Sequence, residues 1–198
     1  MNNQVDAHLI ETKLNSQELF SGHFLHAFRD TVALPDGSQA TREYVTHPGA
    51  VMIIAMLEEA GQPMQLVMER QYRYPVQQVM IEFPAGKLDP NESTLQCAQR
   101  ELFEETGYSA QQWARAGVLH PVISYSTEFI EVWFAKDLRL GTRSLDDGEF
   151  LDVFLQTPES LKLDCLSGKV TDAKTLTGMF WLQNVLQGQH ELNWVSAP

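Results

Sequence analysis

Residues 86–108 read GKLDPNESTLQCAQRELFEETGY, and their second half carries the start and stop signals of one helix. Ser93 suits the N-cap, and Gln96 three positions later completes a capping box. Gly107 stands where a left-handed residue commonly ends a helix, because glycine adopts a positive φ without a Cβ clash. The stretch therefore predicts a helix over residues 94–106.

The two sides of this predicted helix differ in chemistry. The side that can pack against a core carries Leu95, Leu102, Phe103 and Thr106. Glu101, Glu104 and Glu105 project from the other side. Acids three or four positions apart repel by roughly 0.2–0.5 kcal/mol per pair, and the C-terminal end of a helix also disfavours negative charge. Something must therefore compensate these carboxylates.

A bound cation is one way to compensate them. Mg²⁺ and Mn²⁺ prefer carboxylate oxygens and are commonly shared between a few acids and the phosphates of a substrate. Arg100 adds a fixed positive charge that can hold one carboxylate through two hydrogen bonds. The alternative is a solvated acidic face, which is the usual meaning of adjacent glutamates on a helix.

The full spacing of the stretch resembles the Nudix box. The positions that carry the resemblance are Gly86, Glu92, Arg100, Glu101, Glu104, Glu105 and Gly107. A pattern of this length is far more specific than a lone glycine-rich turn. The resemblance implies an α/β/α sandwich with a mixed sheet. It also implies an enzyme that uses Mg²⁺ or Mn²⁺ to split a diphosphate linkage in a nucleoside diphosphate joined to another group.

The length and composition fit one compact domain, with or without a small added layer. The chain has 198 residues, 43% of them hydrophobic, and a net charge of −12 from 26 acids and 14 bases. This charge opposes nonspecific binding to nucleic acid or to an anionic membrane. The chain has no apolar run of about 20 residues and no signal-peptide pattern at its start, so we expect a cytoplasmic location. Its few cysteines and scattered histidines indicate neither a disulfide framework nor a zinc site.

The chain divides into an N-terminal layer, residues 1–47, and a main domain, residues 48–198. Strands are predicted over 20–34 and 39–46, with a turn at Pro35-Asp36-Gly37-Ser38 between them. Because two hairpin-linked strands are marginal alone, the layer needs a partner surface, either the rest of this chain or a second copy. We therefore expect a homodimer.

The main domain combines strands and helices irregularly, which predicts a mixed sheet between helices. Strands are expected over residues 51–57, 65–71, 79–83, 113–119, 129–134 and 150–155. After the central helix, a second helix is expected over 158–166, and a third begins after Asp172 and ends before Gly188. Residues 138–148 are polar and acidic, as in a surface loop.

Segments outside the box resemble the ADP-ribose pyrophosphatase branch of the Nudix family. They are residues 70–75, 81–86 and 148–153, together with Pro121. The branch implies that the Ala85 carbonyl joins Glu101, Glu105, Glu104 and Glu149 in holding metal. It also implies that Arg73 and Glu82 contact substrate and that Arg42 reaches in from an N-terminal layer packed across a homodimer. For Arg42, Arg73 and Glu82 the alternative is a surface salt bridge.

The catalytic base is expected outside the box helix, because acids committed to metal abstract protons poorly. Glu149 aligns with the loop glutamate of the branch, which serves there as base or as an additional metal ligand. Asp147 is the reserve candidate, and a plain solvated loop is the alternative. Arg100 is expected to assist catalysis by holding one helix carboxylate in place, and Glu104 is expected to act as a second ligand or an orienting group.

The predicted reaction is hydrolysis of ADP-ribose to AMP and ribose 5-phosphate. GDP-mannose or another nucleotide sugar is the alternative within the same chemistry, and a nucleotide-sugar sensor or a scaffold with a decayed site are the alternatives outside it. Residues 122–126 lack the glycine that the branch often has after the box, which leaves the terminal sugar open. Phe24, Phe28 and Tyr44 are all candidates to stack on the base.

Overall fold

A computed structural model describes residues 6–145 and 147–197, and the chain forms two compact units. The N-terminal unit contains the chain up to Pro48 together with the loop Val122–Glu128. The larger unit contains Gly49–Pro121 and the chain from Phe129 onward. Residues 1–5 of the expected N-terminal layer lie outside the described residues.

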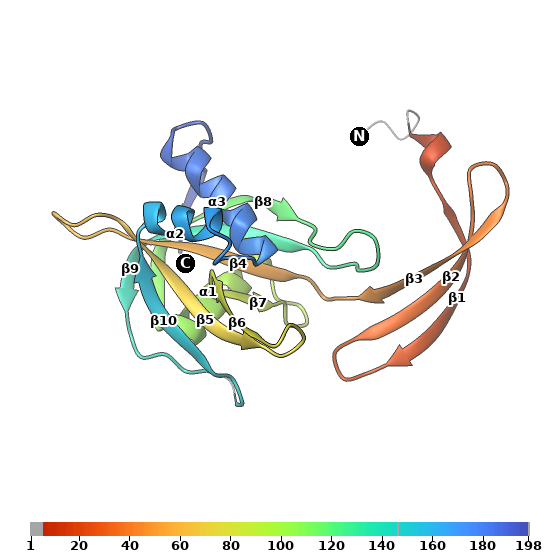
Figure 1. Ribbon diagram of the computed structural model, residues 1–198, viewed down its shortest axis with the longest axis horizontal. Helices are drawn as coiled ribbons and strands as arrows, with labels where there is room; N and C mark the ends of the chain where they lie inside the picture. Colours follow the sequence, from red (N-terminus) through yellow and green to blue (C-terminus); the bar gives the residue numbers. More distant parts are fainter. Residues whose placement is uncertain (1–5, 146, 198) are drawn as a thin grey trace. The chain divides into compact units, whose positions relative to one another are not determined.

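The N-terminal unit is an antiparallel sheet of order β1-β2-β3 (Figure 1). A short 3-10 helix, η1 (Ala7–Leu9), precedes the strands β1 (Thr12–Ser21), β2 (His26–Ala33) and β3 (Gln39–Thr46). The expected single strand over 20–34 is wrong, because Gly22 N donates a hydrogen bond to Leu25 O at 2.9 Å and a turn separates β1 from β2. All of β1 is exposed, so its sequence lacks the alternation that predicts a strand.

The larger unit is built on a mixed sheet of order β10-β5-β4-β9-β8-β11, in which β6 pairs with β5 and β7 pairs with β4. Among the described strand pairings of this larger unit, only that of β4 with β9 is parallel. The strands are β4 (Ala50–Leu57), β5 (Gln65–Arg73), β6 (Gln78–Glu82), β7 (Ala85–Lys87), β8 (Tyr108–Leu119), β9 (Ile130–Leu140), β10 (Leu151–Gln156) and β11 (Trp194–Ser196).

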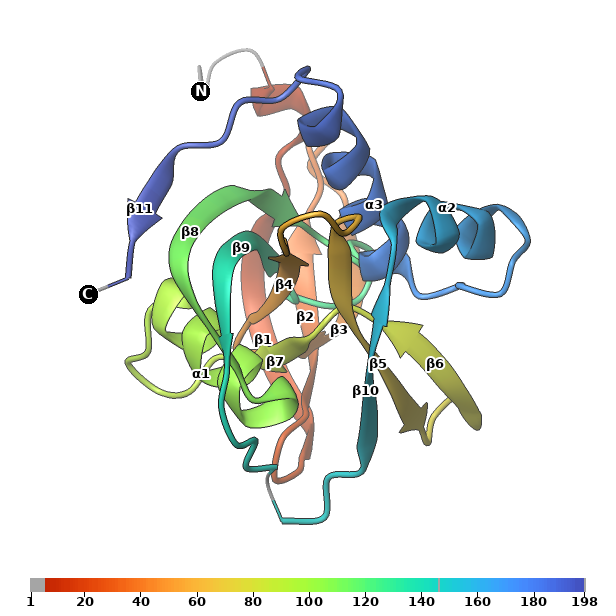
Figure 2. The ribbon, with the colours of Figure 1, turned by 90° about the vertical axis from the view of Figure 1, so that its left-hand side faces the viewer.

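Helices cover both faces of this sheet, which confirms the α/β/α sandwich (Figure 2). They are α1 (Thr94–Thr106), α2 (Pro158–Leu166) and α3 (Ala173–Leu186). Successive residues of β4 point to opposite faces. Ile53 packs in the core that contains Leu102 of α1, whereas Ile54 packs in the core that contains Leu182 of α3. The fully buried run of β4 follows from this two-sided covering.

Helix α1 begins and ends as its sequence predicts. The Ser93 side chain accepts from Gln96 N at 3.3 Å, and Gln96 Oε1 accepts from Ser93 N at 3.0 Å. Gly107 has a φ of 77°. The predicted packing side was partly wrong, because Phe103 is 41% exposed, whereas Glu105, expected on the polar side, is only 3% exposed.

Candidate active site

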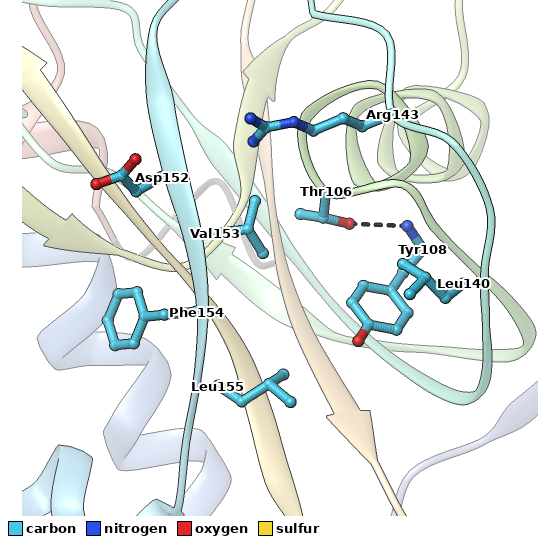
Figure 3. A pocket seen from close by; sticks show the side chains of 8 residues that line it. All are labelled: Thr106, Tyr108, Leu140, Arg143, Asp152, Val153, Phe154 and Leu155. Atoms are coloured by element: carbon cyan, nitrogen blue, oxygen red, sulfur yellow. Dashed lines mark hydrogen bonds between the residues drawn. The ribbon is translucent and has the colours of Figure 1, made fainter.

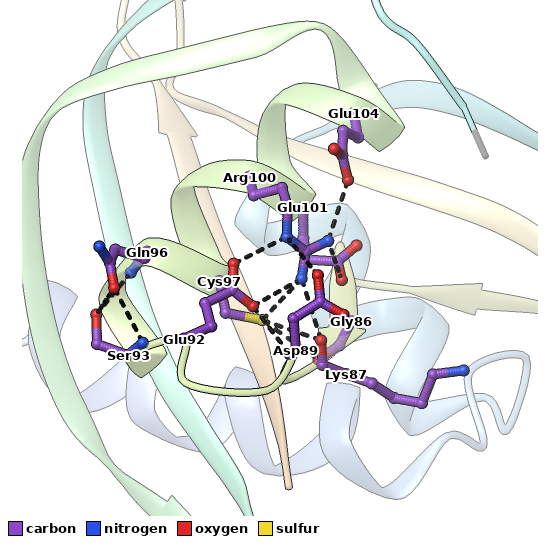
Figure 4. Close-up of polar contacts among 10 residues, drawn as sticks. All are labelled: Gly86, Lys87, Asp89, Glu92, Ser93, Gln96, Cys97, Arg100, Glu101 and Glu104. Atoms are coloured by element: carbon purple, nitrogen blue, oxygen red, sulfur yellow. Dashed lines mark hydrogen bonds and ion pairs between the residues drawn. The ribbon is translucent and has the colours of Figure 1, made fainter. Parts of the chain in front are cut away.

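Arg100 is the centre of a polar cluster between α1 and the loop before it (Figure 4). Its Nε and Nη2 donate to the two carboxylate oxygens of Glu92, each at 2.9 Å. Its Nη1 donates to Glu101 at 2.8 Å and to Glu104 at 3.0 Å. The hydrogen bonds from Arg100 lower the pKa of Glu92 to about 2, so Glu92 holds the guanidinium as an anion near neutral pH. Arg100 in turn holds the two helix glutamates.

Gly86 lets the Glu101 side chain reach the backbone of β7. A Cβ atom at position 86 would lie 1.8 Å from the Glu101 carboxylate carbon, so no larger residue fits beside that carboxylate. Burial raises the pKa of Glu101 to about 7, although the charge of Arg100 opposes this shift. The sequence therefore places one carboxylate tightly against the loop that begins the box.

Glu105 points into the interior next to Ala85. Its Oε2 accepts a hydrogen bond from Ala85 N at 3.1 Å, which joins α1 to the start of β7. Burial raises its pKa well above the usual range, and the negative charges of Glu69, Glu101 and Glu149 add to the shift. Three other carboxyl groups thus act on Glu105 beneath the helix.

One face of β5 supplies further polar groups to this region. Glu69, Gln71 and Arg73 follow Val67 at alternate positions, and Val67 packs in the core under α1. Glu69 and Gln71 were missed by the sequence reasoning. The signal was present in the sequence, because polar residues at every second position of a strand mark one polar face.

Arg73 and Glu82, predicted to contact substrate, bind each other. Arg73 donates from Nε and Nη2 to the two Glu82 oxygens, each at 2.8 Å. Lys174 of α3 also pairs with Glu82, and it pairs with Asp172 at 3.1 Å. Burial alone would raise the pKa of Glu82, but Arg73 and Lys174 lower it instead. The Glu82 side chain is only 3% exposed, whereas that of Arg73 is 41% exposed, so the pair joins a buried acid to a partly exposed guanidinium.

Glu149, the predicted base, is held at the edge of this region. Gln71 Nε2 donates to its Oε1 at 3.3 Å, and its charge raises the pKa of both Glu101 and Glu105. Asp147, the reserve candidate, is exposed. Asp146, between Leu145 and Asp147 in the same loop, lies outside the described residues.

Arg42 belongs to the N-terminal unit, where it pairs with Glu11. The stacking candidates Phe28 and Tyr44 lie there too, with their ring centroids 5.8 Å apart. Tyr44 also donates to Asp30 at 3.1 Å. Within this unit Val45 N donates to Tyr125 O at 2.9 Å, so the loop after the box adds to β3.

The donor set around Glu105 fits a hard divalent cation. In the part of the chain that the structure describes, no three His, Cys, Asp or Glu side chains form a preformed metal cluster, and Arg100 occupies Glu101 and Glu104 instead. However, Glu69 Oε1 is buried without a hydrogen-bond partner among the described residues. Mg²⁺ and Mn²⁺ prefer oxygen ligands. A cation bound here would also offset the repulsion among these buried carboxylates.

A separate open pocket of about 380 Å³ lies at the C-terminal end of α1 (Figure 3). Its lining is formed by Thr106, Tyr108, Leu140, Arg143, Asp152, Val153, Phe154 and Leu155. None of the predicted site residues lines it.

In the described part of the chain, no helix combines the length and the apolar character that a bilayer span requires.

Two family descriptions match adjacent parts of the chain. The NUDIX domain matches residues 46–176. The nucleoside diphosphate sugar hydrolase N-terminal domain matches residues 11–45. The matches thus cover the strands of the N-terminal unit as well as the box and the sheet that carries it.

Named relatives match over most of the chain. The ADP-ribose pyrophosphatase of Bacillus subtilis is 34% identical over 185 residues, which are 91% of this chain and 98% of that protein. The methanol dehydrogenase activator of Bacillus methanolicus is 34% identical over 177 residues, 87% of this chain and 92% of that protein. A crystal structure of an ADP compounds hydrolase has a TM-score of 0.79 over 91% of this chain and 97% of that chain. Its sequence identity is 24%, so this last likeness concerns the fold.

Proposed function

The chain belongs to the Nudix family of pyrophosphohydrolases, and we propose that it hydrolyses ADP-ribose to AMP and ribose 5-phosphate in a divalent-metal-dependent reaction. One observation carries the proposal: Arg100 holds Glu92, Glu101 and Glu104 beside Gly86, while Glu105 turns inward to Ala85. The choice of ADP-ribose is supported by the relative in Bacillus subtilis that bears this activity in its name.

The residues that would hold Mg²⁺ or Mn²⁺ are Glu101, Glu104, Glu105 and the Ala85 carbonyl, whereas Glu149 would stay free of metal. Such a cation, when bound, neutralises the diphosphate and lowers the pKa of a bound water. Arg100 positions Glu101 and Glu104, because its hydrogen bonds fix the direction of both carboxylates. Gly86 leaves the space in which Glu101 lies.

Glu149 is the proposed general base. Its carboxylate takes a proton as water adds to phosphorus and the bond between that phosphorus and the bridging oxygen breaks. The loop that carries Glu149 is anchored by β10, and Gln71 orients the carboxylate at its Oε1. A loop suits this role because it can close over substrate and exclude bulk water.

Arg73 and Glu82 are the proposed substrate contacts on the sheet. Arg73 can exchange one of its bonds to Glu82 for a phosphate oxygen, because a guanidinium binds phosphate in the same forked geometry. Lys174 keeps Glu82 paired when Arg73 moves. We further propose that Arg42, which lies in the part matched by the nucleoside diphosphate sugar hydrolase N-terminal domain, completes the site in a homodimer.

The test is turnover of a panel of nucleotide sugars with Mg²⁺, using the wild type and the variants Glu101→Gln and Glu105→Gln. ADP-ribose should be the best substrate, and each variant should lose orders of magnitude in kcat while keeping its circular dichroism spectrum. A preference for GDP-mannose would correct the substrate and keep the chemistry. Binding of nucleotide sugar without turnover would favour a sensor, and substantial turnover by both variants would refute the assigned ligands.

A further inference from the structure

Glu69 is a buried acid that the reaction outlined above does not use. It lies on β5, is 2% exposed, and faces the α1 side of the sheet, as Val67 does two residues earlier. Its Oε1 has no hydrogen-bond partner among the described residues. A buried carboxylate normally costs several kcal/mol unless a positive group or hydrogen bonds compensate it. The burial of the Glu69 carboxyl group therefore needs an explanation.

The groups around Glu69 are mostly acids. Glu105 hydrogen-bonds to its carboxyl group, and the charges of Glu82 and Glu149 act on it as well. Arg73 is the cation that acts on Glu69, but two bonds of 2.8 Å commit its guanidinium to Glu82. A carboxyl pair between Glu69 and Glu105 that serves only the core is the plain alternative.

We propose that Glu69 is a ligand of the divalent-metal site, supplied by the sheet and facing the ligands on α1. The inference rests on the proposed metal-dependent function. It explains why Glu69 Oε1 has no hydrogen-bond partner although Glu105 bonds to the same carboxyl group, because a cation bound here would give the oxygen its missing partner. It also explains why an acid stands on a strand face that is apolar at Val67.

The test is Mn²⁺ binding to the metal-free full-length chain by isothermal titration calorimetry, without nucleotide. Glu69→Gln should weaken Mn²⁺ binding at least about 10-fold, because loss of a metal-site partner commonly costs 10- to 100-fold in affinity. Glu105→Gln should weaken it as well. Glu131→Gln is the matched control: Glu131 is also a strand glutamate but pairs with Arg115 at 2.7 Å. The Glu131→Gln variant should bind Mn²⁺ with an affinity within about twofold of wild type, since the Glu131 carboxylate is paired with Arg115 rather than with metal.

A second measurement separates a ligand from a core hydrogen-bond partner. Without metal, Glu69→Gln should melt at or above the wild-type Tm, because the amide relieves repulsion among the acids, and Mn²⁺ should raise its Tm less. Glu69→Asp, which keeps the charge, should bind Mn²⁺ with intermediate affinity. If wild type and Glu69→Gln bind Mn²⁺ equally, the inference fails and the function stands. If wild type binds no Mn²⁺, the metal-dependent function fails with it.

Discussion

At the scale of single residues, the site depends on the close approach of the Glu101 carboxylate to Gly86. A Cβ at position 86 would lie 1.8 Å from the carboxylate carbon and must push this side chain away. We predict that Gly86→Ala lowers kcat by about 10²-fold, the loss expected when a catalytic group is misplaced by about 1 Å. Steady-state kinetics with Mg²⁺ and ADP-ribose measure the effect.

The control for this change is Gly61→Ala. Unlike Gly86, Gly61 has a positive φ, 78°, but a Cβ there would meet nothing within 4 Å. Its replacement should cost about 1 kcal/mol of stability through backbone strain and leave kcat unchanged. Equal kcat for the two alanine variants would show that Glu101 does not need the space above Gly86.

The lowered pKa of Glu92 predicts how the stability of the folded chain changes at acid pH. Arg100 lowers its pKa from 4.5 to about 2 in the folded chain. A lowered pKa adds stability above pH 4.5, and this contribution is lost as pH falls from 4.5 toward 2. Glu92→Gln should therefore be less stable than wild type near neutral pH, and the difference should shrink below pH 4.5. Urea unfolding at several pH values measures it. Glu59→Gln, at an exposed turn position, is the control. A difference that stays constant down to pH 2.5 would contradict the prediction.

At the scale of elements, local signals predicted α1 from Ser93 to Gly107, because a capping box and a left-handed glycine act within a few residues. The burial of Glu105 could not be predicted in this way, since it depends on β5 and β7, which contribute Glu69 and Ala85 beside it. Phe103 was placed wrongly for the same reason: helical periodicity gives relative directions but not which neighbour covers a face. Similarly, Glu69 matters through its contact with α1, far away in sequence.

The loop before β10 contains Glu149, the proposed general base. Glu149 is half-buried and bonded to Gln71, whereas Asp147 is exposed. We predict that Glu149→Gln lowers kcat by at least about 10²-fold with little change in KM, the usual contribution of a general base. Asp147→Asn, made in the same loop, should keep wild-type kcat. Damage by the Asp147 change alone would move the role to Asp147, and damage by neither would return the base to α1.

At the scale of the whole molecule, the exposed β1 and the apolar side chains on it indicate an assembly. Leu14, Leu19 and Phe20 are 52%, 43% and 58% exposed. Exposed apolar residues gathered on one strand are typical of a protein interface. We predict a homodimer at micromolar concentration, with residues 1–47 in its interface, as measured by light scattering after size-exclusion chromatography.

Removal of residues 1–47 should abolish dimerisation and substrate binding together, because the proposed contact Arg42 leaves with β3. Removal of residues 1–10, which precede β1, is the control and should preserve both. Mg²⁺ binding to the shortened chain should persist, since its proposed ligands all lie in the larger unit. An active monomer would refute the role assigned to the N-terminal strands.

The loop Val122–Glu128 also constrains the order in which the chain can fold during synthesis. His47 N bonds to Thr127 Oγ1, and the two residues are 80 positions apart. The first strands emerge early from the ribosome, yet the segment that joins β3 is made last among the parts of this unit. At about 5–20 residues per second, this gap lasts roughly 4–16 s. During that interval the exposed strands are open to pairing with another nascent chain, so neighbouring ribosomes on one message could bring two copies together before either is finished.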